Sequence, residues 1–368
     1  MPLVALIGVL TIACHPLSEK ESTRYLVKTE NAAHYKCSEI LDSVHISKLT
    51  LPDSVGLGAI STAKKYDNYL LLASNYGSQS LVCFKDNSFL FHLDKLGSGP
   101  GEYLSLYDFC VNRNELLVLD RDQQKLLFYS LNGGTFIREI KTGQFNCAIE
   151  SLSPDVVILG TDYSDKPVFH YLYLQNMRNG KVIPLLQTSG GLLPEAIYSQ
   201  NFTKLNNHVY FTEPFTERIY TLTTEGCKEI LRIDFGQRKI PESWNTWSSE
   251  YAEAQLATGK YAFGCKMYNP SGSKLALIYH TNIDTYNLLL ADLKTKRQLI
   301  VKNLSEELTG QSIPMPHLVD KGRYLSVFTT DMINLEPNDY WSEKLKDQFF
   351  TEQDIVCVYF VIKFPDLP

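Results

Sequence analysis

The sequence predicts an all-β fold, a six-bladed β-propeller formed by one chain of 368 residues. Apolar runs that end abruptly at a polar residue recur about every 45 residues, which is the length of one four-stranded blade. The 22 tyrosines and 18 phenylalanines favour strands. The polar residues that end the six runs are Asn75, Asp120, Asp162, Glu213, Asn282 and Asp331.

Each unit supplies further strands after its polar stop. In the second unit, 125–130 and 135–140 are the next two strand-like runs, and the turn residues Asn132, Gly133 and Gly134 separate them. A further run before each polar-stopped strand brings the total to about four strands per unit. A β-sandwich needs no fixed period and a β-helix has a much shorter one, so the period favours a propeller.

The interval between Glu213 and Asn282 is the longest and contains an insertion. The segment 241–260 has helix-forming residues, and we expect a helix of about four or five turns between blades four and five. One face of it carries Trp244, Trp247, Tyr251 and Leu256. That face either packs on the propeller or forms a lid or partner surface. A smaller helical segment is expected over 338–349.

The ring of blades must close. The run 354–364 is long and intensely apolar. Propellers usually close when one end of the chain completes a blade begun by the other. We therefore expect residues 45–51 to pair with this last run.

The first residues predict an export signal. Residues 1–13 are uncharged and almost entirely apolar, and the run is too short to span a bilayer as a helix. The segment Leu10-Thr11-Ile12-Ala13-Cys14 resembles the bacterial lipobox, although Thr11 stands where Leu is usual and no Lys or Arg precedes the run. The resemblance implies lipidation at Cys14. The alternative is a buried N-terminal strand. We expect a signal peptide over 1–13, a tether and N-terminal segment over 14–44, and one propeller domain over 45–368.

Charge and cysteine content exclude several classes. The chain has 35 Lys and Arg against 41 Asp and Glu, and basic residues such as Lys64 and Lys65 are scattered, so we expect no nucleic-acid partner. None of the eight cysteines has zinc-binding spacing. Apart from Cys14 we interpret them as buried free thiols, with a few disulfides as the alternative. We expect a monomer.

The stretch 91–109 carries the most recognisable motif, Gly-Ser-Gly-Pro-Gly-Glu-Tyr at 97–103. It resembles the loop between the first and second blades of six-bladed β-propeller lipoproteins from Bacteroides-type bacteria. The following strand, which ends at Asp120, is similar too, as are the lipobox and the terminal strand. The resemblance covers most of the chain. It implies the fold and a periplasmic or surface location, and it implies no particular activity.

Nucleotide and hydrolase motifs are absent from the sequence. The 97–103 loop has neither the Walker nor the dinucleotide-binding spacing and lies between strands, so we interpret its glycines and Pro100 as residues of a tight interblade turn. There is no GxSxG elbow and no HExxH motif. We therefore expect no catalytic residue.

The polar stops are the candidate site, because equivalent strand ends meet at one face of a propeller. They would form a carboxylate-rich ring around the channel mouth, as in lactonase-type propellers, where Glu, Asn and Asp hold a divalent cation such as calcium. The alternative is ordinary turn chemistry. Neighbouring side chains would make a pocket wall for a sugar or peptide: Tyr76, Arg121, Tyr163, Phe215 and His280.

These observations predict an exported, lipid-anchored binding module that takes a polar ligand, glycan or protein partner at the cell envelope. One alternative is a metal-dependent hydrolase or lactonase that uses the carboxylate ring. Another is a structural scaffold that docks through 241–260. We expect no cofactor, apart from the divalent cation that the alternative requires.

Overall fold

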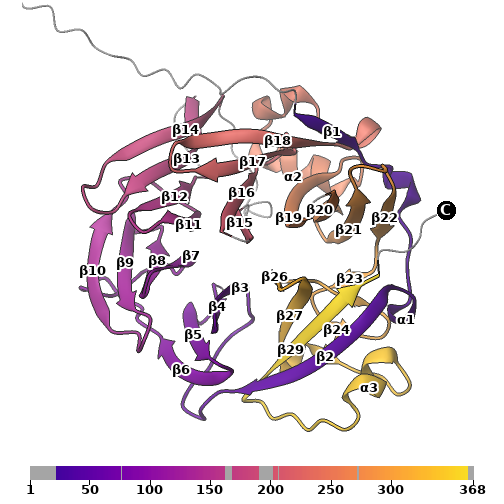
Figure 1. Ribbon diagram of the computed structural model, residues 1–368, viewed down its shortest axis with the longest axis horizontal. Coiled ribbons are helices and arrows are strands. Elements are labelled where there is room, and N and C mark those ends of the chain that lie inside the picture. The colour runs from indigo at the N-terminus through magenta and orange to yellow at the C-terminus, as the bar shows by residue number, and fades with distance from the viewer. Residues whose placement is uncertain are drawn as a thin grey trace, which may run out of the picture.

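The computed structural model describes residues 22–75, 77–161, 168–189, 202–205, 207–271 and 273–363. Six four-stranded antiparallel sheets are arranged as blades around a central axis (Figure 1). The protein is therefore an all-β, six-bladed propeller, as the sequence predicts. In blades one to five the strand nearest the axis comes first along the chain, whereas in blade six the outermost strand comes from the N-terminal end of the chain.

The blades follow the chain order. Blade one contains β3 (Thr62–Tyr66), β4 (Tyr69–Ser74), β5 (Ser80–Lys85) and β6 (Ser88–Leu93). Blade two contains β7 (Asp108–Asn112), β8 (Glu115–Asp120), β9 (Lys125–Ser130) and β10 (Phe136–Lys141). Blade three contains β11 (Ala148–Ser153), β12 (Val156–Gly160), β13 (Val168–Asn176) and β14 (Val182–Ser189).

The second half of the ring continues the pattern. Blade four contains β15 (Phe202–Leu205), β16 (His208–Thr212), β17 (Arg218–Thr223) and β18 (Gly226–Asp234). Blade five contains β19 (Phe263–Ser271), β20 (Lys274–Asn282), β21 (Thr285–Asp292) and β22 (Gln298–Val301). Blade six contains β26 (Leu318–Asp320), β27 (Arg323–Thr329), β29 (Asp354–Ile362) and β2 (Leu41–Thr50).

Burial along the strands follows their place in the blade. The second strands are apolar without alternation, and β8 is buried at every position after Glu115, because both of its faces pack against neighbouring blades. The outer strand β10 alternates between half-buried and exposed residues, because only one of its faces is covered. The second strands therefore produce the apolar runs from which the period is recognised.

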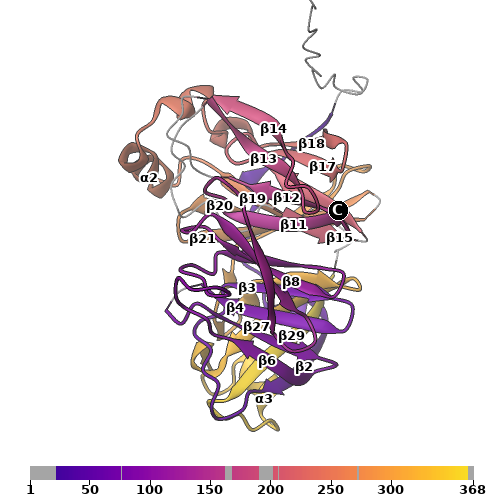
Figure 2. The same ribbon diagram turned by 90° about the vertical axis from the view of Figure 1, so that its left-hand side faces the viewer.

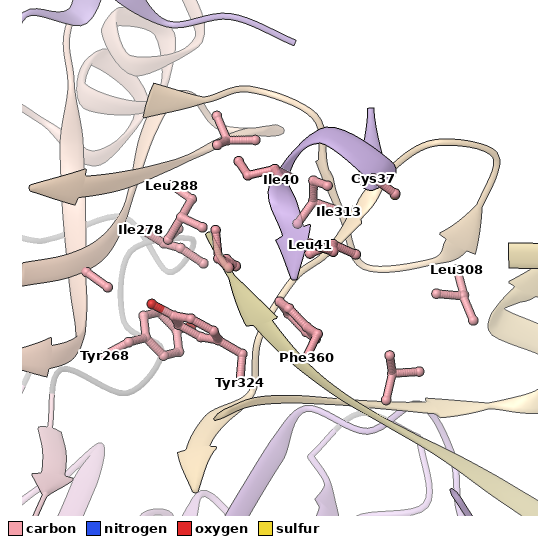
Figure 3. Close-up of a cluster of buried hydrophobic side chains, with 14 of the residues drawn as sticks. Cys37, Ile40, Leu41, Tyr268, Ile278, Leu288, Leu308, Ile313, Tyr324 and Phe360 are labelled. Atoms are coloured by element: carbon pink, nitrogen blue, oxygen red, sulfur yellow. The ribbon is translucent and has the colours of Figure 1, made fainter. Parts of the chain in front are cut away.

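The ring closes between the two ends of the chain. β2 lies antiparallel to β29, with His45 opposite Tyr359 and Thr50 opposite Asp354. The predicted pairing is confirmed. Side chains from both ends share one core with blades five and six, which includes Cys37, Leu41, Tyr268 and Phe360 (Figure 3).

The N-terminal segment before β2 is a belt along the outside of the ring. β1 (Thr23–Leu26) adds a parallel fifth strand to blade four, beside β18. Ala33, after the short helix η1 (Thr29–Asn31), bridges to Val301 on the outer strand of blade five. The helix α1 (Cys37–Ile40) then leads into β2 of blade six. The described part of the expected tether is thus packed against three blades (Figure 1).

The insertion between blades four and five contains short helices and no single long one. The 3-10 helices η3 (Gly236–Arg238) and η4 (Glu242–Thr246) precede α2 (Ser249–Ala257), which projects from one side of the ring (Figure 2). The helix breaks because Trp247 has an extended backbone and the Ser248 hydroxyl caps α2 by accepting a hydrogen bond from the Tyr251 amide. Leu256 is buried on the propeller, whereas Tyr251 is half exposed.

Short strands and short helices also lie in the segment before blade six and between the strands of blade six. These are β23 (Leu304–Ser305), β24 (Leu308–Thr309), β25 (Ile313–Pro314), η5 (Thr330–Met332), β28 (Ile333–Asn334) and α3 (Tyr340–Leu345). α3 lies inside the predicted segment 338–349, and the Asp339 carboxylate caps it by accepting a hydrogen bond from the Ser342 amide.

The described cysteines and helices agree with an ordinary core. Cys37, Cys83, Cys110, Cys265 and Cys357 are buried free thiols, as expected, whereas Cys147 and Cys227 are only partly buried. Within the described ranges, none of the helices combines the length and the apolar character needed to cross a membrane.

Candidate functional site

The 97–103 motif forms a connection between blades one and two that Asp120 organises. The Asp120 carboxylate is buried and accepts hydrogen bonds from the Leu104 amide at 2.9 Å, from the Ser105 hydroxyl at 3.2 Å and from the Gln123 side chain at 2.8 Å. The motif lies between β6 and β7, at the passage from one blade to the next. Asp120 itself was expected at the channel mouth, but its oxygens are used by the loop and are not exposed to a ligand.

Asn75 and Arg121 meet through Tyr107. The Asn75 side-chain amide donates to the Tyr107 carbonyl at 2.8 Å, and the Arg121 guanidinium donates to the Tyr107 hydroxyl at 2.9 Å. These contacts join the second strands of blades one and two at one face of the ring. They hold the two side chains in a structural arrangement between the blades.

The remaining described candidates lie apart from this pair. Glu213 is buried and accepts from the Tyr220 hydroxyl at 3.1 Å. His280 stacks on Phe263, with ring centroids 5.3 Å apart, while Asn282 ends the same strand. Asp331 is exposed in η5.

Several expected residues lie outside the described part of the chain, namely Cys14, Tyr76, Asp162 and Tyr163. Phe215 is buried, with its ring 4.8 Å from that of Trp244. Among the residues described, no three His, Cys, Asp or Glu side chains come close enough together to hold a metal ion.

A different set of polar side chains meets at the axis of the ring. The inner strands of blades one to five supply most of it, and blade six supplies the residue just before its inner strand. We call this set the axial cluster, and it consists of Lys64, Tyr66, Asp108, Glu150, Lys204, Lys266 and His317.

Lys64 of blade one is the hub of the axial cluster. Its ammonium lies 2.8 Å from the Asp108 carboxylate and 3.9 Å from that of Glu150. It also donates to the carbonyls of Phe109 at 2.6 Å and Ile149 at 3.2 Å, which lie on the inner strands of blades two and three. Burial disfavours the ammonium, but Asp108 and Glu150 more than offset this effect and raise the pKa of Lys64.

Glu150 of blade three joins Lys204 to the same group. Lys204 of blade four lies 3.2 Å from the Glu150 carboxylate and donates to the Ser151 carbonyl at 3.1 Å. The Tyr66 hydroxyl lies 3.2 Å from Glu150, and the Lys204 ammonium lies 5.5 Å from the centre of the Tyr66 ring. The charges of blades one to four are therefore linked in one network.

Lys266 of blade five extends the cluster to the opposite side of the axis. The Thr203 hydroxyl donates a hydrogen bond to the Met267 carbonyl at 2.5 Å. Thr203 is next to Lys204 and Met267 is next to Lys266, so this bond holds the two lysine-bearing strands together. Burial, and then the charge of Lys64, lower the pKa of Lys266 to about 8. Burial, and then the charge of Lys266, lower the pKa of His317 to about 4, so this imidazole is neutral at pH 7.

Solvent reaches the axial cluster. The side chain of Lys204 is 28% exposed and that of Lys64 is 16% exposed, although Asp108 and Glu150 are almost completely covered. A separate ion pair, Lys65 to Asp320 at 2.5 Å, joins the inner strands of blades one and six. The arrangement offers solvent-reachable ammonium groups beside covered carboxylates, which is suited to binding a polar ligand by hydrogen bonds and charge.

The axial cluster is absent from the residues predicted from sequence. Its members lie before the apolar runs that end at a polar residue, mostly in strands of mixed polarity. From sequence alone, Lys64 is only one of several scattered basic residues. The sequence feature that could have identified the axial cluster is a charged residue in the strand before an apolar run. Lys64, Glu150 and Lys204 are examples.

Comparison with known proteins identifies the class. The sequence profile of the family described as 6-bladed beta-propeller matches residues 17–325. The chain belongs to this family. No curated protein shows significant sequence similarity to it.

One solved structure has the same fold. An exported protein from Bacteroides fragilis superimposes with a TM-score of 0.72 at 17% identity, covering 93% of this chain and all of that one. BamB from Moraxella catarrhalis is similar at a TM-score of 0.37 and 12% identity, covering 73% of this chain and 66% of that one. At these identities the likeness concerns the fold alone.

Proposed function

We propose that this protein is an exported propeller lipoprotein that binds a polar ligand, such as a glycan or peptide, at the axis of its ring in the cell envelope. The observation that carries the proposal is the axial cluster, in which the inner strands of blades one to five, and His317 just before that of blade six, bring charged or polar side chains to a place that solvent reaches. The lipobox-like segment that ends at Cys14 supports export and anchoring.

A binding role agrees with how the cluster is built. Its lysines and carboxylates already bond to one another and to the inner strands, so they form a fixed polar surface before a ligand arrives. Preorganised donors and acceptors of this kind favour affinity, because few groups must be reordered on binding. The kind of ligand would then depend on which donors and acceptors of the axial cluster a ligand can reach from solvent, chiefly those near Lys204.

A ligand panel tests the proposal. The full chain carrying Cys14→Ser, which removes the expected lipid site, would be applied to immobilised neutral and acidic glycans and peptides. We expect at least one to bind, and Lys204→Trp to abolish that binding by filling the axis. Lys228→Trp, at an exposed position of β18, is the matched control and should bind normally. Binding that survives Lys204→Trp would place the ligand elsewhere on the ring.

A further inference from the structure

The turn between β16 and β17 of blade four, residues 213–217, is both buried and strained. Phe215 and Glu217 have left-handed backbone, with φ of +62° and +55°. Residues other than glycine adopt this conformation at a cost, so it persists only where the surrounding contacts hold it. Both side chains are covered, at 3% and 4% exposed. We call residues 213–217 the blade-four turn.

Glu217 ties this turn to the next blade. Its carboxylate accepts a hydrogen bond from the Cys265 amide of β19 at 3.3 Å, and its own carbonyl accepts one from the Ile233 amide of β18 at 2.9 Å. The other carboxylate oxygen, Oε1, is buried and has no hydrogen-bond partner among the described residues. The contact between blades four and five therefore includes a carboxyl group that is only half satisfied.

The Glu217 carboxyl is not paired with a cation. Arg218 is 40% exposed and lies 4.0 Å from Glu213, which also accepts from the Tyr220 hydroxyl. Within the described ranges, no Lys, Arg or His side chain forms an ion pair with Glu217. A buried carboxylate without opposite charge is costly, so the group holds its proton more strongly than in water. Burial raises the pKa of Glu217 to about 7, although hydrogen bonds from β19 oppose the effect.

The other titratable or charged groups beside the turn come from blade five and from the insertion. Burial raises the pKa of Cys265 and of Tyr279 and lowers that of His280, so these three groups are neutral at pH 7. Arg238 of η3 donates to a backbone carbonyl at the far end of the insertion at 3.2 Å. A change of charge at pH 7 between these two blades therefore falls to Glu217.

The same turn holds the insertion between blades four and five. The Phe215 ring lies 4.8 Å from that of Trp244 in η4. Phe215 also belongs to the core that buries Ile240 and Leu256 of the insertion. A displacement of the blade-four turn would therefore be transmitted to the segment 236–257.

We propose that the blade-four turn is a pH-sensitive contact, which holds the insertion on the ring while Glu217 is protonated and loosens it when Glu217 ionises. An ionised Glu217 gains hydration by moving towards solvent, and this movement draws the turn out of its left-handed conformation and weakens the contact of Phe215 with Trp244. The device goes beyond the proposed function, because it acts on the insertion and not on the axial cluster.

The direction of the effect follows from the two protonation states. The ordinary pKa of the group is 4.5 and that in the folded chain is about 7. The stability that this contact contributes is therefore fully present below pH 4.5 and is lost as the pH rises through about 7. In the folded chain the contact itself changes state near pH 7.

The test follows Trp244 in the full chain carrying Cys14→Ser, with all tryptophans replaced by 5-fluorotryptophan. Fluorine NMR spectra would be recorded from pH 5.5 to 8.5, and Trp244→Phe assigns the resonance. We expect the Trp244 resonance to shift with a midpoint near pH 7. Glu217→Gln, which is neutral at every pH, should abolish this transition. Glu242→Gln is the matched control, because Glu242 lies two residues from Trp244 and its side chain is 93% exposed, and it should keep the transition.

Two results overturn the proposal: a Trp244 resonance without a transition near pH 7, or a transition that persists unchanged in Glu217→Gln. If Glu217→Gln fails to fold, carbon NMR of the parent chain labelled with ¹³C-glutamate replaces it. One glutamate carboxyl must then titrate near pH 7 together with the Trp244 resonance, and ordinary midpoints for all of them reject the device. No ligand is added, so the outcome is independent of binding at the axis.

Discussion

Asp108 accepts a hydrogen bond from the backbone amide of Ile149 at 2.8 Å, so a carboxylate of blade two holds the inner strand of blade three. The same carboxylate lies 2.8 Å from the ammonium of Lys64 in blade one. One side chain therefore joins three successive blades at the axis. The axial cluster is a part of the fold as well as a candidate site, and substitutions there affect both.

Replacing Asp108 by Asn tests this link. Asp108→Asn keeps a hydrogen-bond acceptor but removes the charge beside Lys64, and a buried ammonium left with a weaker partner should lower the free energy of unfolding by about 2–4 kcal/mol. Urea denaturation measures it. Asp155→Asn is the control, because Asp155 pairs with the largely exposed Arg178 and its loss should cost less than about 1 kcal/mol. Equal effects for the two variants would show that the axial link does not contribute to stability.

Gly101 in the connection between blades one and two is predicted to accept no side chain without a loss of stability. Its φ is +75°, and a Cβ there would lie 2.7 Å from Cγ of the Phe136 side chain. Gly101→Ala should lower the midpoint of urea unfolding, at a cost of about 1–3 kcal/mol from backbone strain and crowding. Gly133→Ala, where a Cβ meets nothing within 4 Å, should be nearly neutral. An unchanged midpoint in Gly101→Ala would mean that the loop adapts freely.

Lys266 is predicted to destabilise the fold in a pH-dependent way. Its pKa falls from the ordinary 10.5 to about 8 on folding. Below pH 8 both states are protonated and the folded state bears the full penalty. Between pH 8 and 10.5 only the unfolded state retains the proton, so stability rises with pH, and above 10.5 the penalty is gone.

Lys266→Met should therefore stabilise the protein by roughly 1–3 kcal/mol at pH 7, and by progressively less from pH 8 to 10.5. Urea unfolding at several pH values measures the difference between the two chains. An advantage that is constant with pH would show that the charge of Lys266 is not its source.

Lipid attachment at Cys14 is predicted from the lipobox-like segment. Cells given a labelled fatty acid should incorporate label into the parent chain and not into Cys14→Ala, because the thiol of Cys14 is the attachment point. Cys37→Ala, which removes a buried core thiol, should retain the label. Label in Cys14→Ala would reject the prediction.

The fold could be predicted from sequence because the second strand of each blade is buried on both faces. Strands such as β8 are continuous apolar runs, and their spacing reveals the blade. The closing pair β2 and β29 follows from the same reasoning, because a ring needs a partner for its last apolar strand. The insertion was predicted less well, since the extended backbone at Trp247 depends on packing that no local pattern encodes.

The axial cluster could not be predicted from sequence because its members are brought together only by ring closure. Lys64 and Lys266 lie on different blades, and no spacing along the chain relates them. Asp120 is the opposite case, because the sequence singles it out as a candidate site residue while its contacts are those of a turn. Its position at a strand end suggested a ligand, whereas its contacts with Leu104 and Gln123 satisfy the backbone of a turn.

The belt, whose first strand is β1, has a mechanical consequence if the chain carries the lipid anchor that its lipobox-like segment predicts. A pull on that end first meets the β1–β18 ladder on blade four, then the bridge between Ala33 and Val301, and only then the β2–β29 pair that closes the ring. Tension from the anchor would have to detach these contacts one after another. The β2–β29 seam of the ring would thus bear such a load only after the belt has detached.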